Sequence, residues 1–292
     1  MNRLRTMLFS PSSKPKNFIN APVYHADCII FDLEDSISIK EKDSARDLLC
    51  EAISSLDYSN CQICVRINSL HTPFGEDDVR AIVPAGIRFI RLAMCESSDD
   101  IIELDHLLTQ IERHSNIPIG SVKIQASIET AKGVLNAREI VHASQRVISL
   151  SFGAEDYTRS MGTNRSADGL ELSFARQYLP VVAAEAGITA IDTVWSDLEN
   201  QEGFIKDVTR AKAFGFSGKS CIHPSQIPYV NSTFFPSCDE ISYAKKVISA
   251  MREAEEKGIG VFTVDGKMVD EPVVAKAYHI LMQAGERSVS FE

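Results

Sequence analysis

The chain has 292 residues, 44% of them hydrophobic, which is enough apolar side chain for a sizeable core in one large or two ordinary domains. The 40 acidic residues outnumber the 30 basic ones, and the net charge of −10 argues against a general nucleic-acid binder, which presents a basic face. No apolar run is long enough to cross a membrane, and the N-terminal stretch lacks the apolar region of a signal peptide. The seven scattered cysteines suit a reducing compartment, so we expect a cytoplasmic protein.

Short apolar and β-branched runs alternate along the chain with amphipathic helical patterns. The second run, DCIIFDL, is almost continuously apolar, which is typical of a strand buried on both faces. The eight predicted strands are residues 5–10, 27–33, 62–68, 87–93, 123–128, 147–152, 190–195 and 216–222.

Helical periodicity separates several of these strands and continues beyond the last one. In the first clear case Ile101, Leu104, Leu108 and Ile111 fall on one stripe. Capping and stop residues mark the ends of other helices. The predicted helices are residues 100–113, residues 131–142 after Thr130, a helix capped by Ser166 that runs to Gly187, and residues 239–257 before Gly258.

Eight strand-then-helix units within about 250 residues match the count and size of a (β/α)8 TIM barrel. A doubly wound open sheet shares this alternation, but the glycine fingerprint of a dinucleotide site is missing after the first strand. We therefore predict a TIM-barrel catalytic domain over residues 1–258. Residues 259–292 are expected to form a C-terminal extension that contacts a neighbouring subunit, with a hairpin around Asp265-Gly266 and a final helix from Pro272 to about Gly285.

Polar side chains cluster at the predicted carboxyl ends of the strands. In a parallel barrel these ends share one face, where active sites lie. Carboxylates from different strands favour a hard cation such as Mg2+, which takes one or two of them and keeps waters and substrate oxygens. Each acid alone could equally cap the following helix. The candidates are Glu34 and Asp35, Arg66, Glu129, and the pair Glu155 and Asp156.

Other residues have two interpretations. Arg66 either forms a structural ion pair or clamps an anionic oxygen. Cys61 and Cys64 have metal-like spacing, but three-residue spacing in a strand points them to opposite faces, which favours structural cysteines. Lys219 in the eighth strand is a candidate for Schiff-base chemistry.

The N-terminal segment carries a basic cluster. Arg3, Arg5, Lys14 and Lys16 either form a solvated face or bind an anionic ligand.

Beyond these patterns, the chain resembles the citrate lyase β-subunit family, within the HpcH/HpaI aldolases and the malyl-, citramalyl- and citryl-CoA lyases. The resemblance covers nearly the whole chain. It rests on ordered motifs: Arg5-Thr-Met-Leu-Phe-Ser-Pro, Phe31-Asp-Leu-Glu-Asp-Ser, Val65-Arg-Ile-Asn, Ile128-Glu129, Gly153-Ala-Glu-Asp-Tyr, Phe174-Ala-Arg, Ile191-Asp-Thr-Val, Gly215-Phe-Ser-Gly-Lys, His223-Pro-Ser-Gln-Ile and Asp265-Gly-Lys-Met-Val-Asp270.

The resemblance implies a Mg2+-dependent TIM-barrel enzyme in which Glu129 and Asp156 ligate the metal. Arg66, Glu129 and Arg5 are then substrate-binding residues. Glu34 and Asp35 join Arg66 in the catalytic set, holding metal-bound water or the Lys42 and Arg46 pair. Asp270 acts as acid/base by reaching into the barrel mouth of a neighbouring subunit, which implies a homotrimer.

The implied reaction cleaves a carbon–carbon bond in a citryl- or citramalyl-type acyl thioester, on CoA or acyl carrier protein, releasing oxaloacetate or pyruvate and an acetyl thioester. Mg2+ acts there as Lewis acid and template. The family usually has Pro-Lys after the fourth strand, whereas this chain has Ala93-Met94, so the acyl group stays open. The alternatives are a malyl-CoA-type lyase or thioesterase, and a non-catalytic scaffold paralogue.

Overall fold

The computed structural model describes residues 4–166, 168–256 and 261–285. Eight parallel strands close into a barrel in sequence order, with β1 paired to both β2 and β8. The predicted TIM barrel is confirmed, and the open sheet is excluded because β8 pairs with β1. The strands are β1 (Thr6–Pro11), β2 (Cys28–Asp32), β3 (Gln62–Ile67), β4 (Phe89–Leu92), β5 (Lys123–Ile128), β6 (Val147–Phe152), β7 (Thr189–Asp192) and β8 (Gly218–Cys221).

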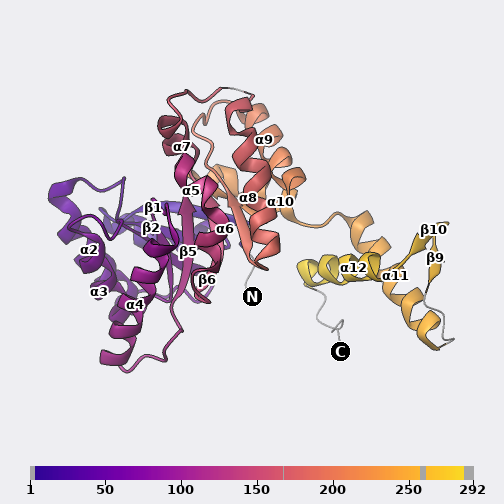
Figure 1. The fold of residues 1–292 in the computed structure, drawn as a ribbon, viewed down its shortest axis with the longest axis horizontal. Helices are drawn as coiled ribbons and strands as arrows, with labels where there is room; N and C mark the ends of the chain where they lie inside the picture. Colours follow the sequence, from indigo (N-terminus) through magenta and orange to yellow (C-terminus); the bar gives the residue numbers. More distant parts are fainter. Residues whose placement is uncertain (1–3, 167, 257–260, 286–292) are drawn as a thin grey trace. The chain divides into compact units, whose positions relative to one another are not determined.

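Helices flank the barrel strands, and neighbours such as α2, α3 and α4 pack side by side along its outside (Figure 1). The α-helices are α1 (Pro15–Asn20), α2 (Lys42–Ser55), α3 (Gly75–Ala85), α4 (Ser98–His114), α5 (Ala131–Leu135), α6 (Ala137–His142), α7 (Ala154–Ser160), α8 (Ser173–Glu185), α9 (Gln201–Phe214), α10 (Ile227–Phe234), α11 (Cys238–Glu256) and α12 (Glu271–Ala284). The 3-10 helices are η1 (Ala21–Tyr24), η2 (Ile39–Glu41), η3 (Leu170–Leu172) and η4 (Pro224–Gln226).

Two predicted helices differ from the structure. The segment 131–142 forms two short helices, because the chain breaks at Asn136, whose side-chain amide donates to the Glu96 carbonyl at 2.8 Å. Ser166 does not cap α8. Its hydroxyl instead bonds the carboxylates of Asp168 and Glu171, so a 3-10 turn precedes the helix, which begins at Ser173.

The barrel interior has an apolar lower layer. Side chains of alternate strand residues meet there, including Met7, Ile30, Phe89 and Ile191. Cys64 is buried in the same layer, and burial raises the pKa of its thiol to about 12, so the thiol stays protonated. Cys61 and Cys64 are both free, in accord with their interpretation as structural cysteines.

The chain divides into two compact units, Met1–Asn231 and Ser232–Glu292. The second contains α11, α12 and the antiparallel hairpin of β9 (Phe262–Val264) and β10 (Lys267–Val269). The predicted hairpin is present, and its turn residues Asp265 and Gly266 have φ angles of 50° and 76°, as a type I′ turn requires.

The sequence grouped α11 with the barrel, whereas the structure groups it with the hairpin and α12. Val247 and Ile248 of α11 share a buried apolar cluster with Val264 and Leu281, which explains the grouping. The expected boundary at 258 and the helix stop at Gly258 lie outside the described residues.

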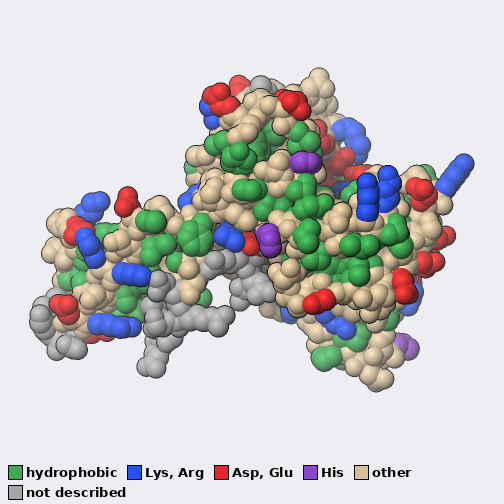
Figure 2. Space-filling view, turned by 180° about the vertical axis from the view of Figure 1, so that it is seen from behind, with side chains coloured by type: hydrophobic (Ala, Val, Ile, Leu, Met, Phe, Trp, Pro, Cys, Tyr) green, Lys and Arg blue, Asp and Glu red, His purple; other side chains and the backbone are tan. Residues whose placement is uncertain are grey.

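Acidic and basic side chains are interspersed on the face seen in the space-filling view, with apolar side chains between them (Figure 2). Within the described ranges, no helix combines the length and apolarity needed to cross a membrane.

A buried ion pair ties α4 to the segments before β5 and β6. Arg146 donates to both carboxylate oxygens of Glu112, at 2.9 and 2.7 Å. The backbone N–H groups of Gly120 and Val122 donate to the same carboxylate at 2.9 Å each. Burial alone raises the pKa of Glu112, but these bonds outweigh it and lower the pKa to about 2.

We expect Glu112→Gln to lower the free energy of unfolding at pH 7 by about 2–4 kcal/mol, because it leaves Arg146 buried without its main counter-charge. Because the pKa of Glu112 is lower in the folded than in the unfolded protein, its carboxylate stabilises the folded state at pH values above the unfolded-state pKa. This contribution is lost as the pH falls toward 2. Urea unfolding from pH 7 to pH 2 should therefore show the gap between variant and wild type closing on acidification. Glu103→Gln, at an exposed acid of the same helix, is the control. A pH-independent gap contradicts the prediction.

Candidate active site

A pocket of about 400 Å³ opens at the carboxyl ends of the barrel strands. It brings together five residues that the sequence selected from four different strand ends: Asp35, Arg66, Glu129, Glu155 and Asp156. The remaining lining residues are Phe9, Pro11, Asp32, Ser36, Arg91, Phe152, Gly153, Ala154, Thr193, Val194, Ser220 and Ile222.

Arg66, at the end of β3, is held by acids from the end of β2. Its Nε and Nη2 donate to the two Asp32 oxygens at 2.6 and 2.7 Å. Burial would lower the pKa of Arg66, but the bonds and charge of Asp32 outweigh it and raise the pKa. Arg66 is therefore permanently charged and fixed in orientation, with its guanidinium carbon 4.9 Å from the Phe9 ring centroid.

The side chains of Glu34 and Asp35 also face Arg66. Their carboxylates lie 2.9 and 3.4 Å from Arg66 Nη1. Burial and the neighbouring acids raise the pKa of Glu34 to about 7, although Arg66 opposes this rise. Glu34 can therefore carry a proton near neutral pH.

Lys42 and Arg46 do not pair with the side chains of Glu34 and Asp35, so this part of the expectation is wrong. The Lys42 ammonium donates to the backbone carbonyls of Leu33 and Glu34 and to Asn68 Oδ1. Arg46 pairs with Asp43 and Asp78. Lys42 therefore supports the backbone of the loop after β2, and the acids of this loop are left to Arg66.

Glu129 follows β5 and is buried beneath the pocket. Its oxygens accept from the Ser127 hydroxyl at 2.5 Å and from the Met94 backbone N–H at 3.3 Å. Gly153 leaves room for this side chain, because a Cβ there would lie 2.5 Å from Glu129 Cγ. A glycine is needed at this position so that the ends of β5 and β6 can hold the carboxylate between them.

Asp156 lies in the first turn of α7, directly after β6. Its carboxylate pairs with Arg159 at 2.6 Å and is about one-fifth exposed, at 22%. Glu155 pairs instead with Arg165 at 2.8 Å and is 57% exposed. The two adjacent acids thus differ: Asp156 is the more buried and its charge acts on Glu129, whereas Glu155 is the more exposed.

The charges of Glu129 and Asp156 fit a hard divalent cation. Burial raises the pKa of both carboxyls, and the charge of Asp156 adds to the rise at Glu129. A cation between them would relieve this cost. Among the described residues no group of three or more acids, histidines or cysteines forms a metal cage. Two carboxylates with room for water and substrate oxygens match the ligand preference of Mg2+.

Two predicted residues of the first unit lie away from this pocket. Arg5 precedes β1, at the opposite end of the barrel, and donates to both Asp27 oxygens at 2.8 Å. Lys219 is fully buried outside the pocket, with its ammonium 2.6 Å from both Asp192 and Asp207. A lysine buried away from the pocket and held by two carboxylates cannot reach a substrate carbonyl, as a Schiff base requires. Asp270 belongs to the second unit, where its side chain caps α12 by accepting from the Val273 N–H.

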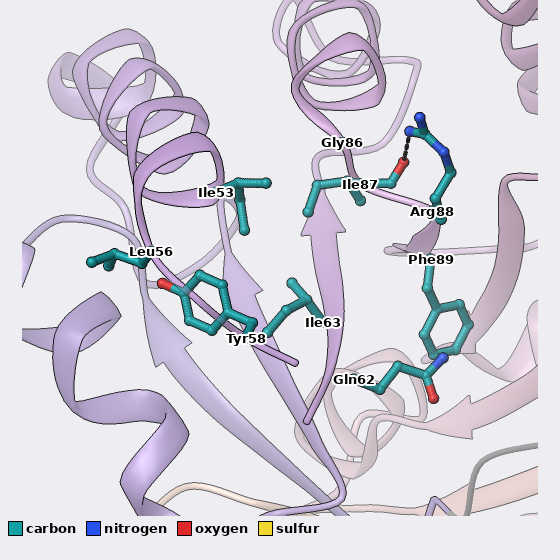
Figure 3. Close-up of a pocket in the computed structure, with 9 residues that line it drawn as sticks. All are labelled: Ile53, Leu56, Tyr58, Gln62, Ile63, Gly86, Ile87, Arg88 and Phe89. Atoms are coloured by element: carbon teal, nitrogen blue, oxygen red, sulfur yellow. Dashed lines mark hydrogen bonds between the residues drawn. The ribbon is translucent and has the colours of Figure 1, made fainter. Parts of the chain in front are cut away.

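A second hollow, of about 350 Å³, lies at the amino ends of β3 and β4. Its lining is mainly apolar, with Ile53, Leu56, Tyr58 and Ile63 pointing into it (Figure 3). Arg88 is the charged residue in the lining of this hollow, and its guanidinium donates to the backbone carbonyls of Val83 and Ile87. This hollow therefore lacks acid/base or metal chemistry.

Among the pocket side chains that the sequence did not select, Phe9, Asp32 and Arg91 contact Arg66 or lie beside it in the strand register. All three are strand residues that point into the barrel. Asp32 and Arg91 stand on either side of Arg66 in the strand register. The sequence signal for Arg91 is its spacing in β4: it lies two residues from Phe89, so the two side chains share one face of the strand.

With this geometry established, the chain can be compared with known proteins. The sequence profile of the HpcH/HpaI aldolase/citrate lyase family matches residues 5–224. The chain belongs to this family. The citrate lyase subunit beta of Leuconostoc mesenteroides subsp. cremoris is 45% identical over 280 residues, covering 96% of this chain and 93% of that protein.

Two solved structures are also similar. CitE from Mycobacterium tuberculosis, in complex with magnesium, acetoacetate and coenzyme A, superposes with a TM-score of 0.77 at 32% identity, covering 96% of this chain and 98% of that one. The citrate lyase beta subunit from the same organism, complexed with oxaloacetate and magnesium, has a TM-score of 0.68 at 32% identity and covers 81% of this chain and 100% of that one. The predicted family and the class of oxo-acid carbon–carbon lyase are confirmed, and these homologues contain the predicted metal.

For a family member with this site, we expect Glu129→Gln and Asp156→Asn each to weaken Mg2+ binding about tenfold or more, because each would remove one of the two carboxylates expected to ligate the metal. Isothermal titration calorimetry with Mg2+ measures the effect. Glu155→Gln is the matched comparison, since this acid is adjacent but pairs with Arg165. Equal losses in all three variants contradict the assignment.

Proposed function

We propose that this protein is a Mg2+-dependent lyase that cleaves a citryl- or citramalyl-type acyl thioester into a 2-oxo acid and an acetyl thioester. The observation that carries the proposal is the meeting of Glu129 and Asp156 with Arg66 in one pocket at the catalytic face of the barrel. Full-length similarity to a citrate lyase beta subunit supports the same chemistry.

The reaction breaks the bond between the hydroxyl-bearing carbon and the carbon next to the thioester carbonyl. The hydroxyl loses its proton and becomes the keto oxygen of the released oxo acid. The electron pair of the broken bond passes to the thioester as an enolate, which is protonated to the acetyl thioester. Mg2+ bound by Glu129 and Asp156 would supply Lewis acidity toward the hydroxyl and the adjacent carboxylate.

The chain's own residues supply orientation and charge. Asp32 accepts two hydrogen bonds from the Arg66 guanidinium and so fixes its orientation. The guanidinium can then present its positive charge to the developing enolate oxygen without reorganising. Glu34 faces the same guanidinium, and its raised pKa suits it to hold a proton or a water close to the reacting atoms.

The acyl carrier is proposed to be coenzyme A, as in the solved CitE complex, with acyl carrier protein as the alternative. Arg5 contributes nothing to carrier binding in this proposal, because its guanidinium pairs with Asp27 at the other end of the barrel.

Asp270 is proposed to complete the site as acid/base in a neighbouring copy, within a homotrimer. Its position supports this role in one respect. Asp270 is the N-cap residue of α12 and directly follows the hairpin. Its carboxylate accepts a 3.3 Å hydrogen bond from the Val273 N–H, and no ion pair among the described residues holds it.

The first test incubates the pure protein with Mg2+ and citryl-, citramalyl- and malyl-CoA, and identifies the products by mass spectrometry. We expect oxaloacetate or pyruvate with acetyl-CoA, and loss of product when EDTA removes the metal. Arg66→Lys should lower kcat by about 100-fold, since a lysine cannot keep the bidentate contact with Asp32. Release of free CoA without oxo acid identifies a thioesterase, and no turnover of any thioester favours a scaffold protein; either result overturns the proposal.

The role of Asp270 is tested by mixing two inactive variants, Glu129→Gln and Asp270→Asn. In a trimer with shared sites, about a quarter of the sites in a random mixture regain both residues. We therefore expect activity to return after subunit exchange. Size-exclusion chromatography with distinguishable tags confirms that mixed oligomers form. Mixed oligomers without recovered activity refute a shared site.

A further inference from the structure

Arg91 is the one pocket cation to which the proposed reaction gives no role. It lies in β4, between Arg66 of β3 and Gln125 of β5 in the strand register. Its side chain points into the barrel beneath the pocket and is only 2% exposed, yet it contributes to the pocket lining.

The Arg91 guanidinium has weak partners. Its Nε reaches the Ser127 hydroxyl at 3.3 Å, and its Nη1 reaches the Ser220 hydroxyl at 3.4 Å. Across the described ranges of the chain, no carboxylate forms an ion pair with it. The other buried arginines all have one: Arg46 pairs with Asp78, Arg146 with Glu112, and Arg176 with Asp192.

A buried cation without an anion is costly, and its placement calls for an explanation. Burial and the nearby charge of Arg66 lower the pKa of Arg91 to about 10, against the opposing charge of Glu129. It therefore remains protonated at neutral pH. The Phe9 ring, with its centroid 5.0 Å from the guanidinium carbon, stabilises the charge but does not neutralise it.

The acids of the pocket are already engaged. Asp32 is committed to Arg66, and Asp156 pairs with Arg159. Glu129 accepts from Ser127 and Met94 and is the proposed metal ligand. An anion that enters the pocket would therefore find in Arg91 a guanidinium that no protein carboxylate has neutralised.

We propose that Arg91 binds the second carboxylate of a dicarboxylic oxo acid, so that the site selects a citryl thioester over a citramalyl thioester. This inference rests on the proposed function. The two substrates differ in one substituent on the hydroxyl-bearing carbon, a carboxymethyl group in citryl and a methyl group in citramalyl. One substituent carries a negative charge and the other is apolar, and a buried guanidinium favours the first.

Met94 replaces the lysine usual in the family, but this replacement does not leave the pocket without a cation next to Arg66. In the sequence, this replacement of a cation leaves the acyl group open. Three residues before Met94, within β4 itself, Arg91 supplies a positive charge inside the barrel. The pocket wall therefore carries a positive charge at Arg91, although Met94 brings none after the strand.

The test measures binding of oxaloacetate and of pyruvate by calorimetry in the presence of Mg2+. We expect wild type to bind freshly prepared oxaloacetate about tenfold or more tightly than pyruvate. Arg91→Gln should remove this preference by weakening oxaloacetate alone, while Arg91→Lys should retain part of it. Arg88→Gln is the matched control, because this arginine lies at the other end of β4 and bonds only backbone carbonyls (Figure 3).

Equal affinity of wild type for the two oxo acids overturns the inference, as does an unchanged preference in Arg91→Gln. If Arg91→Gln does not fold, the wild-type ratio and Arg91→Lys still decide. In Arg91→Gln, the ratio of kcat/KM for citryl-CoA to that for citramalyl-CoA should fall together with the ratio of oxaloacetate to pyruvate affinity. Failure of the proposed function gives a different result, because wild type would then release no oxo acid from either thioester. The ratio of oxaloacetate to pyruvate affinity would still report on Arg91.

Discussion

The pairing of Arg66 with Asp32 is the interaction on which the site depends. Two short hydrogen bonds across neighbouring strands fix a guanidinium at the mouth of the barrel. The same arginine lies against Glu34 and Asp35, so it allows several carboxylates to be concentrated in a small space. Without it, the acids of the β2 loop would repel one another and the carboxylate of Glu129, and the pocket could not hold its charges in place.

Even with Arg66, the pocket holds more acid than base, and this imbalance gives the site its chemistry. The raised pKa values of Glu34, Glu129 and Asp156 express the free-energy cost of crowding carboxylates where water is scarce. A divalent cation bound by Glu129 and Asp156 would relieve that cost. Arg91 adds a positive charge deeper in the barrel, where a substrate anion rather than a protein carboxylate is placed to meet it.

Inside the barrel, the residues that pack the strands and the residues of the active-site pocket lie in different layers. Its lower layer is apolar, with Met7, Ile30, Phe89 and Ile191, and gives the strands a packed base. Arginines, serines and carboxylates occupy the layer above. Outside the barrel, Lys219 and Arg176 pair with Asp192 and Asp207, so that strong cations there stabilise the fold and stay out of the reaction.

The sequence alone predicted the eight strands, the closed barrel, the acids at its catalytic face and the family, because alternating patterns and strand-end motifs are local properties of the chain. It could not place Arg5, which looked like part of a basic binding cluster until Asp27 was found beside it. It did not select Arg91, since whether a strand arginine faces barrel or helix depends on the register of its neighbours. It also assigned α11 to the barrel, whereas packing against Val264 and Leu281 places it in the second unit. Partners of buried charges are set by contacts between distant segments, and only the tertiary structure decides them.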